Sequence, residues 1–188
     1  VYGIPANLFE ENCQIFLVPM VDPDGVDLVT GGIAQGSIQW EQAKRLSNNY
    51  PSVPFPNGWK ANLLGVDLNL QYPARWLQAR EIKFSQGYTR PGPRDYVGKA
   101  PLTQRESRAL ADFTNYLDPA LILAYHTQGE QIYWKYDDVD VPGALALGQE
   151  FARLSGYSLE ETPYASGFAG YKDWFIKVWR RPGFTIEA

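Results

Sequence analysis

Two residues able to carry acid–base or metal chemistry directly follow short apolar segments that are typical of strands. His126, the only histidine, comes after Ala120–Tyr125, and Glu187 comes after Phe184–Ile186. In open α/β sheets ligands bind beyond the carboxyl ends of the strands, so both side chains are candidates for such a site. The imidazole could bind a metal ion or act as a general base. A carboxylate in an apolar segment is costly to bury unless it is paired or used.

Each candidate also has a purely structural explanation. A histidine at a strand end is more often simply hydrogen-bonded than functional, and Glu187 could lie on an exposed strand edge. Asp67 and Asn69, at the end of the short segment 63–68, could converge with them. The residues taken alone leave both interpretations open.

The elements that must position these side chains alternate between strand-like and helix-like stretches, which predicts a layered α/β fold. Strands are expected at Cys13–Met20, Ala120–Tyr125, Gln131–Tyr136 and Phe184–Ala188. Helices are expected at Ser37–Leu46, from Thr103 to before Pro119, from Pro142 to before Gly156, and at about Tyr171–Arg181.

Three local signals refine these expectations. The run Ala120–Tyr125 is too short for a helix and is expected to be a buried central strand. The sequence from Thr103 to Glu106 has the form of a capping box, which predicts a helix start. The residues Val21–Gly25 are rich in turn formers and are expected to form a loop.

Composition sets the broad class of the protein. The 188 residues are 45% hydrophobic and 14% aromatic, which is typical of one globular domain. The net charge is -4 with acidic and basic residues interspersed, which argues against a nucleic-acid-binding surface. No apolar run is long enough to span a bilayer. Cys13 is the only cysteine, so an intrachain disulfide and a thiolate zinc cluster are excluded.

Four separated segments, in the right order, resemble the carboxypeptidase-A-like zinc metallopeptidases. They are 18–25 (VPMVDPDG), 59–62 with 65–69 (WKAN and GVDLN), 124–127 (AYHT), and 166–187 with its SG, KDWF and PGFTIE motifs. Each motif alone is weak, but four in order over nearly the whole chain make a specific match. The resemblance implies a mixed parallel and antiparallel sheet flanked by helices.

The resemblance also implies catalytic roles for three residues. His126 matches the third ligand of one zinc ion. Glu187 matches the glutamate that acts as general base toward the water activated by zinc and then protonates the leaving amine. Lys60 stands in the place of an arginine that polarises the scissile carbonyl, where a lysine can stabilise the oxyanion as a point charge.

Two further residues match substrate-binding positions of the family. Asn69 matches the asparagine that holds a substrate carboxylate. Tyr164 is the favoured counterpart of the mobile tyrosine over the substrate, with Tyr171 as the rival. The residue after Asn69 departs from the family pattern, because Leu70 replaces the arginine that pairs with a terminal carboxylate in exopeptidases.

A second departure concerns the metal. The other two zinc ligands of the family come from a His-x-x-Glu motif, and this chain has no second histidine. We therefore expect residues 1–188 to be a single partial peptidase domain, incomplete at its N-terminal and C-terminal ends and inactive alone. The remaining zinc ligands are expected upstream of Val1. A metal-free relative is the alternative.

The region around Leu70 indicates a subfamily. The stretch 67–73 (DLNLQYP) and WKAN at 59–62 look like the bacterial γ-D-glutamyl-L-diamino acid endopeptidases, which cut peptidoglycan stem peptides. The expected substrate is accordingly a peptide or muropeptide. The alternatives are a metallocarboxypeptidase that releases C-terminal residues and a non-catalytic relative that binds cell-wall peptides. The sequence does not fix the compartment, but a cell-wall substrate favours the cell envelope or secretion over the cytoplasm.

Overall fold

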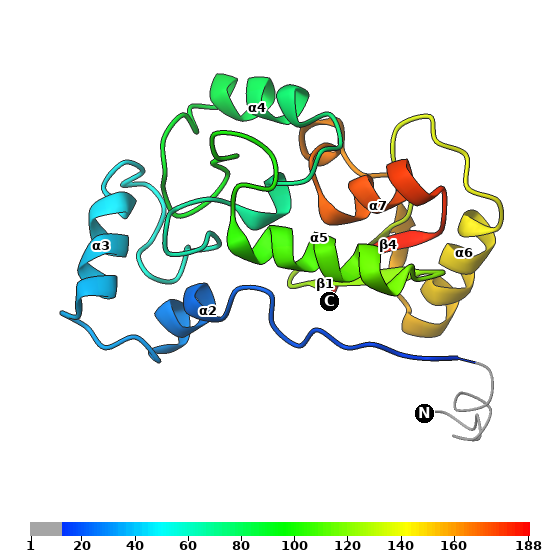
Figure 1. Cartoon of the computed structure of the whole chain (residues 1–188), viewed down its shortest axis with the longest axis horizontal. Coiled ribbons are helices and arrows are strands. Elements are labelled where there is room, and N and C mark those ends of the chain that lie inside the picture. The colour runs from blue at the N-terminus through cyan, green and yellow to red at the C-terminus, as the bar shows by residue number, and fades with distance from the viewer. Residues whose placement is uncertain (1–12) are drawn as a thin grey trace.

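The computed structural model describes residues 13–188, so the part of the expected domain before Cys13 lies outside it (Figure 1). The α-helices are α2 (Pro23–Thr30), α3 (Ile38–Ser47), α4 (Trp76–Ser85), α5 (Arg105–Leu117), α6 (Ala144–Ser155) and α7 (Tyr171–Trp179). Two short 3-10 helices are η1 (Leu68–Leu70) and η2 (Tyr164–Ser166). The strands are β1 (Ile122–His126), β2 (Gln131–Tyr133), β3 (Ser158–Glu160) and β4 (Gly183–Glu187). None of the described helices is long and apolar enough to cross a membrane.

The strands form one mixed sheet in the order β1-β4-β2-β3. β4 pairs in parallel with β1 and antiparallel with β2, and β2 pairs in parallel with β3. Helices flank this sheet, with α5 and α7 on the side of β1 and β4 and α6 beside β3 (Figure 1). The predicted mixed α/β architecture is confirmed.

The last strand, β4, lies in the buried core of the protein. Four of the five β4 residues are buried, and Phe184 is completely inaccessible. Helix α7 packs against β4 and β1, and its residues Trp174, Phe175 and Ile176 are all buried. Within α7 the rings of Phe175 and Trp179 stack, with their centroids 5.1 Å apart.

Two expectations about strands are wrong. Residues Cys13–Met20 are extended but belong to no strand, and Leu17 is 82% exposed. Ile122–His126 is a strand, but it is the edge of the described sheet rather than its centre, with Tyr125 71% exposed. An apolar run indicates a tendency to be buried and does not say which backbone will pair with it.

Two expectations about local structure are also wrong. The residues expected to form a loop at Val21–Gly25 start helix α2, because Pro23 suits a first helical turn and Asp22 accepts a hydrogen bond from the Gly25 backbone at 3.1 Å. The capping box at Thr103 is not formed: the Thr103 hydroxyl bonds instead to the Gln71 side chain at 2.9 Å. Thr103 thus contacts a residue distant in the sequence and does not cap the helix, although the helix itself is confirmed as α5.

Candidate active site

The pairing of β1 with β4 brings together two residues far apart in the sequence. His126 and Glu187 are register partners in this parallel pair, each the last residue of its strand. Register partners on neighbouring parallel strands project from the same face of a sheet, and such strands lie about 4.8 Å apart. The backbone ladder continues past them, since the Ala188 amide donates to the His126 carbonyl at 2.9 Å. The two predicted residues therefore lie side by side at the carboxyl ends of two neighbouring strands.

The loop that follows His126 is held in uncommon backbone conformations. Gln128, Gly129 and Glu130 have φ values of 87°, 144° and 51°. A side chain at position 129 would place its Cβ 3.2 Å from the Cβ of Glu187. Strained backbone of this kind clusters at functional sites. The sequence analysis missed this feature, although a glycine three residues after the histidine was its visible signal.

The charge of Lys60 reaches both strand-end residues. Burial lowers the pKa of His126, and the nearby Lys60 ammonium lowers it further. A neutral imidazole is the form that binds metals. Burial raises the pKa of Glu187, while Lys60 opposes that shift. The three side chains predicted to carry catalysis are thus electrostatically coupled.

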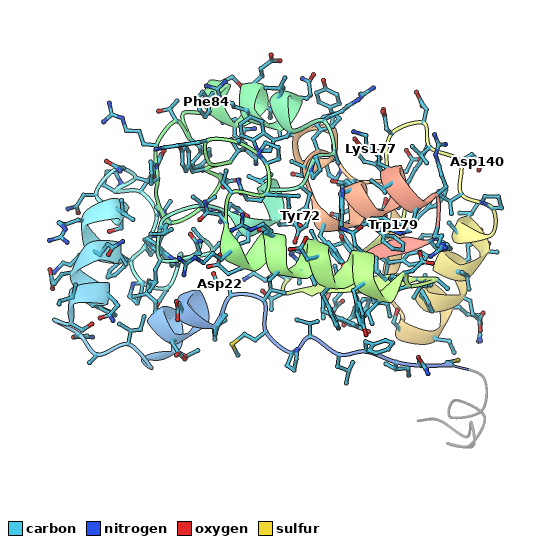
Figure 2. All side chains as sticks on the ribbon, viewed as in Figure 1. Asp22, Tyr72, Phe84, Asp140, Lys177 and Trp179 are labelled. Carbon is cyan, nitrogen blue, oxygen red and sulfur yellow. The ribbon has the colours of Figure 1, made fainter. Side chains whose placement is uncertain are left out.

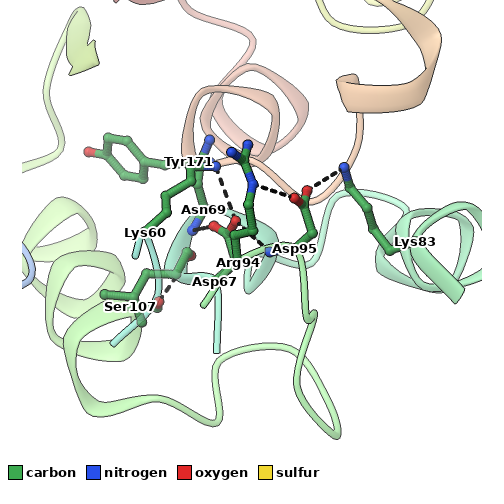
Figure 3. Close-up of polar contacts among 9 residues, drawn as sticks. Lys60, Asp67, Asn69, Lys83, Arg94, Asp95, Ser107 and Tyr171 are labelled. Carbon is green, nitrogen blue, oxygen red and sulfur yellow. Dashed lines mark hydrogen bonds and ion pairs between the residues drawn. The ribbon is translucent and has the colours of Figure 1, made fainter. Parts of the chain in front are cut away.

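Lys60 is anchored by Asp67, as Figure 3 shows. Its Nζ lies 3.1 Å from Asp67 Oδ2, and the carboxylate is 1% exposed while the lysine side chain is 44% exposed. The Asp67 charge raises the Lys60 pKa, so the lysine remains a cation. Asp67 also accepts from the backbone amides of Asn69 and Asp95, each at 3.2 Å. One buried carboxylate thereby fixes the positions of Lys60 and Asn69.

A second set of ion pairs, centred on Asp95, lies next to Asp67 (Figure 3). Asp95 lies 2.6 Å from Lys83 Nζ and 2.8 Å from Arg94 Nε. Burial alone would raise the pKa of Asp95, but hydrogen bonds from Lys83 and Arg94 outweigh it and the pKa lies below its ordinary value. The network holds the backbone amide of Asp95 against Asp67. The sequence did not indicate this network, because Lys83 lies on α4 whereas Arg94 and Asp95 lie in the loop before α5.

The side-chain amide oxygen of Asn69 is held by the start of α7. Its Oδ1 accepts from the backbone amide of Tyr171, the first residue of α7, at 3.0 Å (Figure 3). The first amides of a helix have no intrahelical acceptor, so this contact satisfies one of them. The side-chain Nδ2 group remains as a donor suited to a carboxylate.

The two tyrosines considered for the substrate cover lie in different surroundings. Tyr171 is packed against Tyr72 with ring centroids 5.3 Å apart, and its hydroxyl is 2.8 Å from Thr114 Oγ1. Tyr164 lies in η2 and is 68% exposed, with its ring edge against Phe168. Tyr171 is held by packing and a hydroxyl contact, whereas Tyr164 is mostly exposed, and this difference favours Tyr164 for the role.

The described residues do not form a complete zinc site by themselves. Within residues 13–188, no three His, Cys, Asp or Glu side chains lie close enough together to hold a metal ion. His126 offers one nitrogen donor, whereas a catalytic zinc usually takes three protein ligands. Lys60, whose charge lowers the pKa of His126, is a cation and no ligand.

A histidine and a glutamate at adjacent strand ends of a mixed sheet are what the resemblance to zinc carboxypeptidases implied. The family model described as zinc carboxypeptidase matches residues 6–183, and the chain belongs to this family. It is 48% identical over 187 residues to γ-D-glutamyl-L-diamino acid endopeptidase 1 of Lysinibacillus sphaericus, covering 100% of this chain and 45% of that protein. It is 39% identical over 183 residues to the uncharacterized protein YqgT of Bacillus subtilis strain 168, covering 97% of this chain and 46% of that protein.

Solved structures give a weaker likeness. Murein-tripeptide amidase MpaA from Escherichia coli O157 is 20% identical with a TM-score of 0.49, and the match covers 76% of this chain and 56% of that one. Thrombin activatable fibrinolysis inhibitor is 18% identical with a TM-score of 0.48, covering 65% and 33%. The chain spans about half the length of the curated relatives it matches.

Proposed function

We propose that this chain is part of a zinc-dependent endopeptidase that hydrolyses the bond between γ-D-glutamate and a diamino acid in peptidoglycan stem peptides. The observation that carries the proposal is the in-register pair of His126 and Glu187 with the Lys60 charge acting on both. The 48% identity to a protein named for this activity supports the choice of substrate. Such a substrate favours the cell envelope or secretion.

The zinc site of this proposal is shared with other parts of the protein. His126 would supply one ligand, and the remaining ligands are expected upstream of Val1. When bound, the zinc ion supplies Lewis-acid chemistry for amide hydrolysis. The steps below rest only on residues of this chain.

Each residue of the proposed site has a distinct task in the hydrolysis. Glu187 takes a proton from the attacking water and delivers it to the leaving amine nitrogen as the carbon–nitrogen bond breaks. Its raised pKa suits a group that must both accept and donate that proton. Lys60 places a positive charge where the carbonyl oxygen becomes negative. Asn69 Nδ2 and Tyr164 bind the substrate.

Leu70 favours an endopeptidase over a carboxypeptidase. Its side chain is 7% exposed and packs in the main apolar cluster, so this position offers no cation to a terminal carboxylate. The metallocarboxypeptidase alternative would need another cation for that contact. The alternative of a non-catalytic cell-wall binding protein would need no Glu187 beside His126.

The test is zinc content and muropeptide cleavage by the full-length protein, with a Glu187→Gln variant. We expect one zinc per chain, cleavage after γ-D-glutamate, and loss of turnover in the variant with its zinc retained. Release of ordinary C-terminal residues would instead support the carboxypeptidase alternative. Unchanged turnover in the variant would remove Glu187 from the chemistry, and no zinc with no cleavage would favour the binding protein.

A further inference from the structure

Glu187 has a second cross-strand neighbour, Gln131, on the side away from His126. Gln131 is the first residue of β2 and the register partner of Glu187 in the antiparallel pair of β2 and β4. His126 holds the same relation to Glu187 in the parallel pair of β1 and β4. Register partners on neighbouring strands project from the same face of a sheet. The three side chains therefore form one row across the sheet, with Glu187 in the middle.

The apolar residues next to this row show which face it occupies. Ile132 follows Gln131, Ile186 precedes Glu187, and both pack with Phe184 in a buried cluster. Successive side chains of a strand point to opposite faces, so Gln131 and Glu187 point away from that cluster. Both are only half-buried. The row thus lies on the face of the sheet that a substrate and water can reach.

The strained loop between β1 and β2 passes beside both side chains. A Cβ atom added to Gly129 would lie 3.2 Å from Glu187 Cβ and 3.9 Å from Gln131 Cδ. The two side chains therefore border the same point of the loop backbone. Because Gly129 carries no side chain there, the Gln131 amide and the Glu187 carboxylate have room to meet.

The amide of Gln131 is oriented by Tyr133, two residues further along β2. Its Oε1 accepts a hydrogen bond from the Tyr133 hydroxyl at 2.5 Å. Burial, followed by the charges of Glu187 and Glu160, raises the pKa of Tyr133, so the hydroxyl keeps its proton and is the donor. With Oε1 engaged in this way, the other end of the Gln131 amide is the Nε2 group, which can only donate.

We propose that Gln131 is a positioning residue for Glu187, whose carboxylate accepts a hydrogen bond from Gln131 Nε2 in the substrate complex and is thereby turned toward the attacking water. The two side chains have equal length, and cross-strand Cβ atoms lie about 5 Å apart, so their ends are within reach of each other. Hydrogen bonds to a general base commonly tighten when the substrate binds. The assignment rests on the proposed function, in which Glu187 is the general base.

The test is steady-state cleavage of a muropeptide by the full-length protein with Gln131→Met, which keeps the length of the side chain and removes the amide. We expect kcat to fall about 10- to 100-fold, because a misdirected general base loses its reactive geometry, while KM and zinc content stay unchanged. Tyr133→Phe leaves the amide free to rotate and should lower kcat about fivefold. Because Tyr133 acts through Gln131, the double variant should be no slower than Gln131→Met alone.

The control is Gln149→Met, the same substitution at an exposed glutamine of α6, which should leave kcat and KM unchanged. An unchanged kcat in Gln131→Met would overturn the proposal. A raised KM at unchanged kcat would also overturn it, because Gln131 would then contact the substrate instead of Glu187. Independent, multiplying losses in the double variant would overturn the orienting role of Tyr133.

The variant Glu187→Gln separates this proposal from the proposed function. If Glu187→Gln is inactive while Gln131→Met is fully active, the proposed function stands and the role of Gln131 is rejected. If Glu187→Gln keeps full activity, the proposed function itself is rejected.

Discussion

His126 and Glu187 are register partners at the carboxyl ends of the parallel strands β1 and β4. A shift of the pairing by one residue would turn one of the two side chains to the opposite face of the sheet. The buried side chains of β4, such as Phe184 against Phe151 at 5.1 Å, fix that register. The geometry of the proposed site is therefore set by the packing of the core beneath it.

Lys60 should matter for catalysis through its charge. Replacing it with methionine keeps the apolar stem and removes the cation that faces the developing oxyanion, so kcat should fall about 100- to 1000-fold. Lys60→Arg keeps a cation, so its kcat should fall much less than that of the methionine variant. The measurement is steady-state cleavage of a muropeptide by the full-length protein. Equal activity of the methionine and arginine variants would show that the charge is not used.

Substitutions of Tyr164 and Tyr171 should affect different properties, activity for Tyr164 and stability for Tyr171. Tyr164→Phe alters an exposed ring and should raise KM or lower kcat without changing the free energy of unfolding. Tyr171→Phe removes the hydroxyl contact with Thr114 and should cost about 1 kcal/mol of stability with little effect on activity. Urea unfolding and kinetics on the same two variants give both readouts. The opposite pattern would make Tyr171 the substrate cover.

Asp22 should make stability depend on pH. Its pKa in the folded protein is raised to about 6, first by burial and then by nearby carboxylates, including Glu106, against the opposing hydrogen bond from Gly25. A raised acid pKa means that the folded state binds the proton more tightly. The stabilisation is therefore complete below the unfolded pKa of about 4 and is lost as the pH rises through 6.

The matched variant for Asp22 is Asp22→Asn, since asparagine also caps helices but carries no charge. The variant should be more stable than the wild type above pH 7, by about 1 to 2 kcal/mol after allowance for solvent screening at this half-buried position. The difference should disappear near pH 4. Urea unfolding of both proteins at pH 4.5 and pH 7.5 measures it. A constant difference at both values would mean that Asp22 titrates normally.

The sequence predicted the elements that carry the site better than it predicted their neighbours. The strand before His126 and the strand that ends at Glu187 were both expected, because short apolar runs closed by polar residues are strong local signals. The edge position of β1 was not expected, since strand order depends on contacts between distant segments. Helix α4 was also not predicted, because only Trp76 and Ala79 along it are buried and the periodicity of its apolar residues is weak.

The same contrast holds within the site. Lys60 and Asn69 were selected by resemblance, but the carboxylate that holds both, Asp67, became an anchor only in three dimensions. The hydrogen bonds from Lys172 Nζ to the Lys135 carbonyl and the Thr162 hydroxyl could not be predicted for the same reason, because these partners lie 37 and 10 residues away. Long-range polar contacts leave no local periodicity to read.

The chain of 188 residues, produced alone, should self-associate. The segment 13–21 exposes apolar side chains, Leu17 at 82% and Ile15 at 65%, and it passes below α5 in Figure 1. β1 is the outer strand of the described sheet, with Tyr125 71% exposed. An unpaired strand edge beside exposed apolar residues is a site for association between chains.

Light scattering against protein concentration measures this association. Leu17→Lys and Tyr125→Lys place charges on the two exposed apolar positions and should raise the soluble fraction, because charged residues protect strand edges. Lys177→Gln, an exposed polar substitution on α7, serves as a surface control and should leave the association unchanged (Figure 2). A monomer with one cooperative thermal transition would contradict the prediction and would mean that the β1 edge and residues 13–21 tolerate water as they stand.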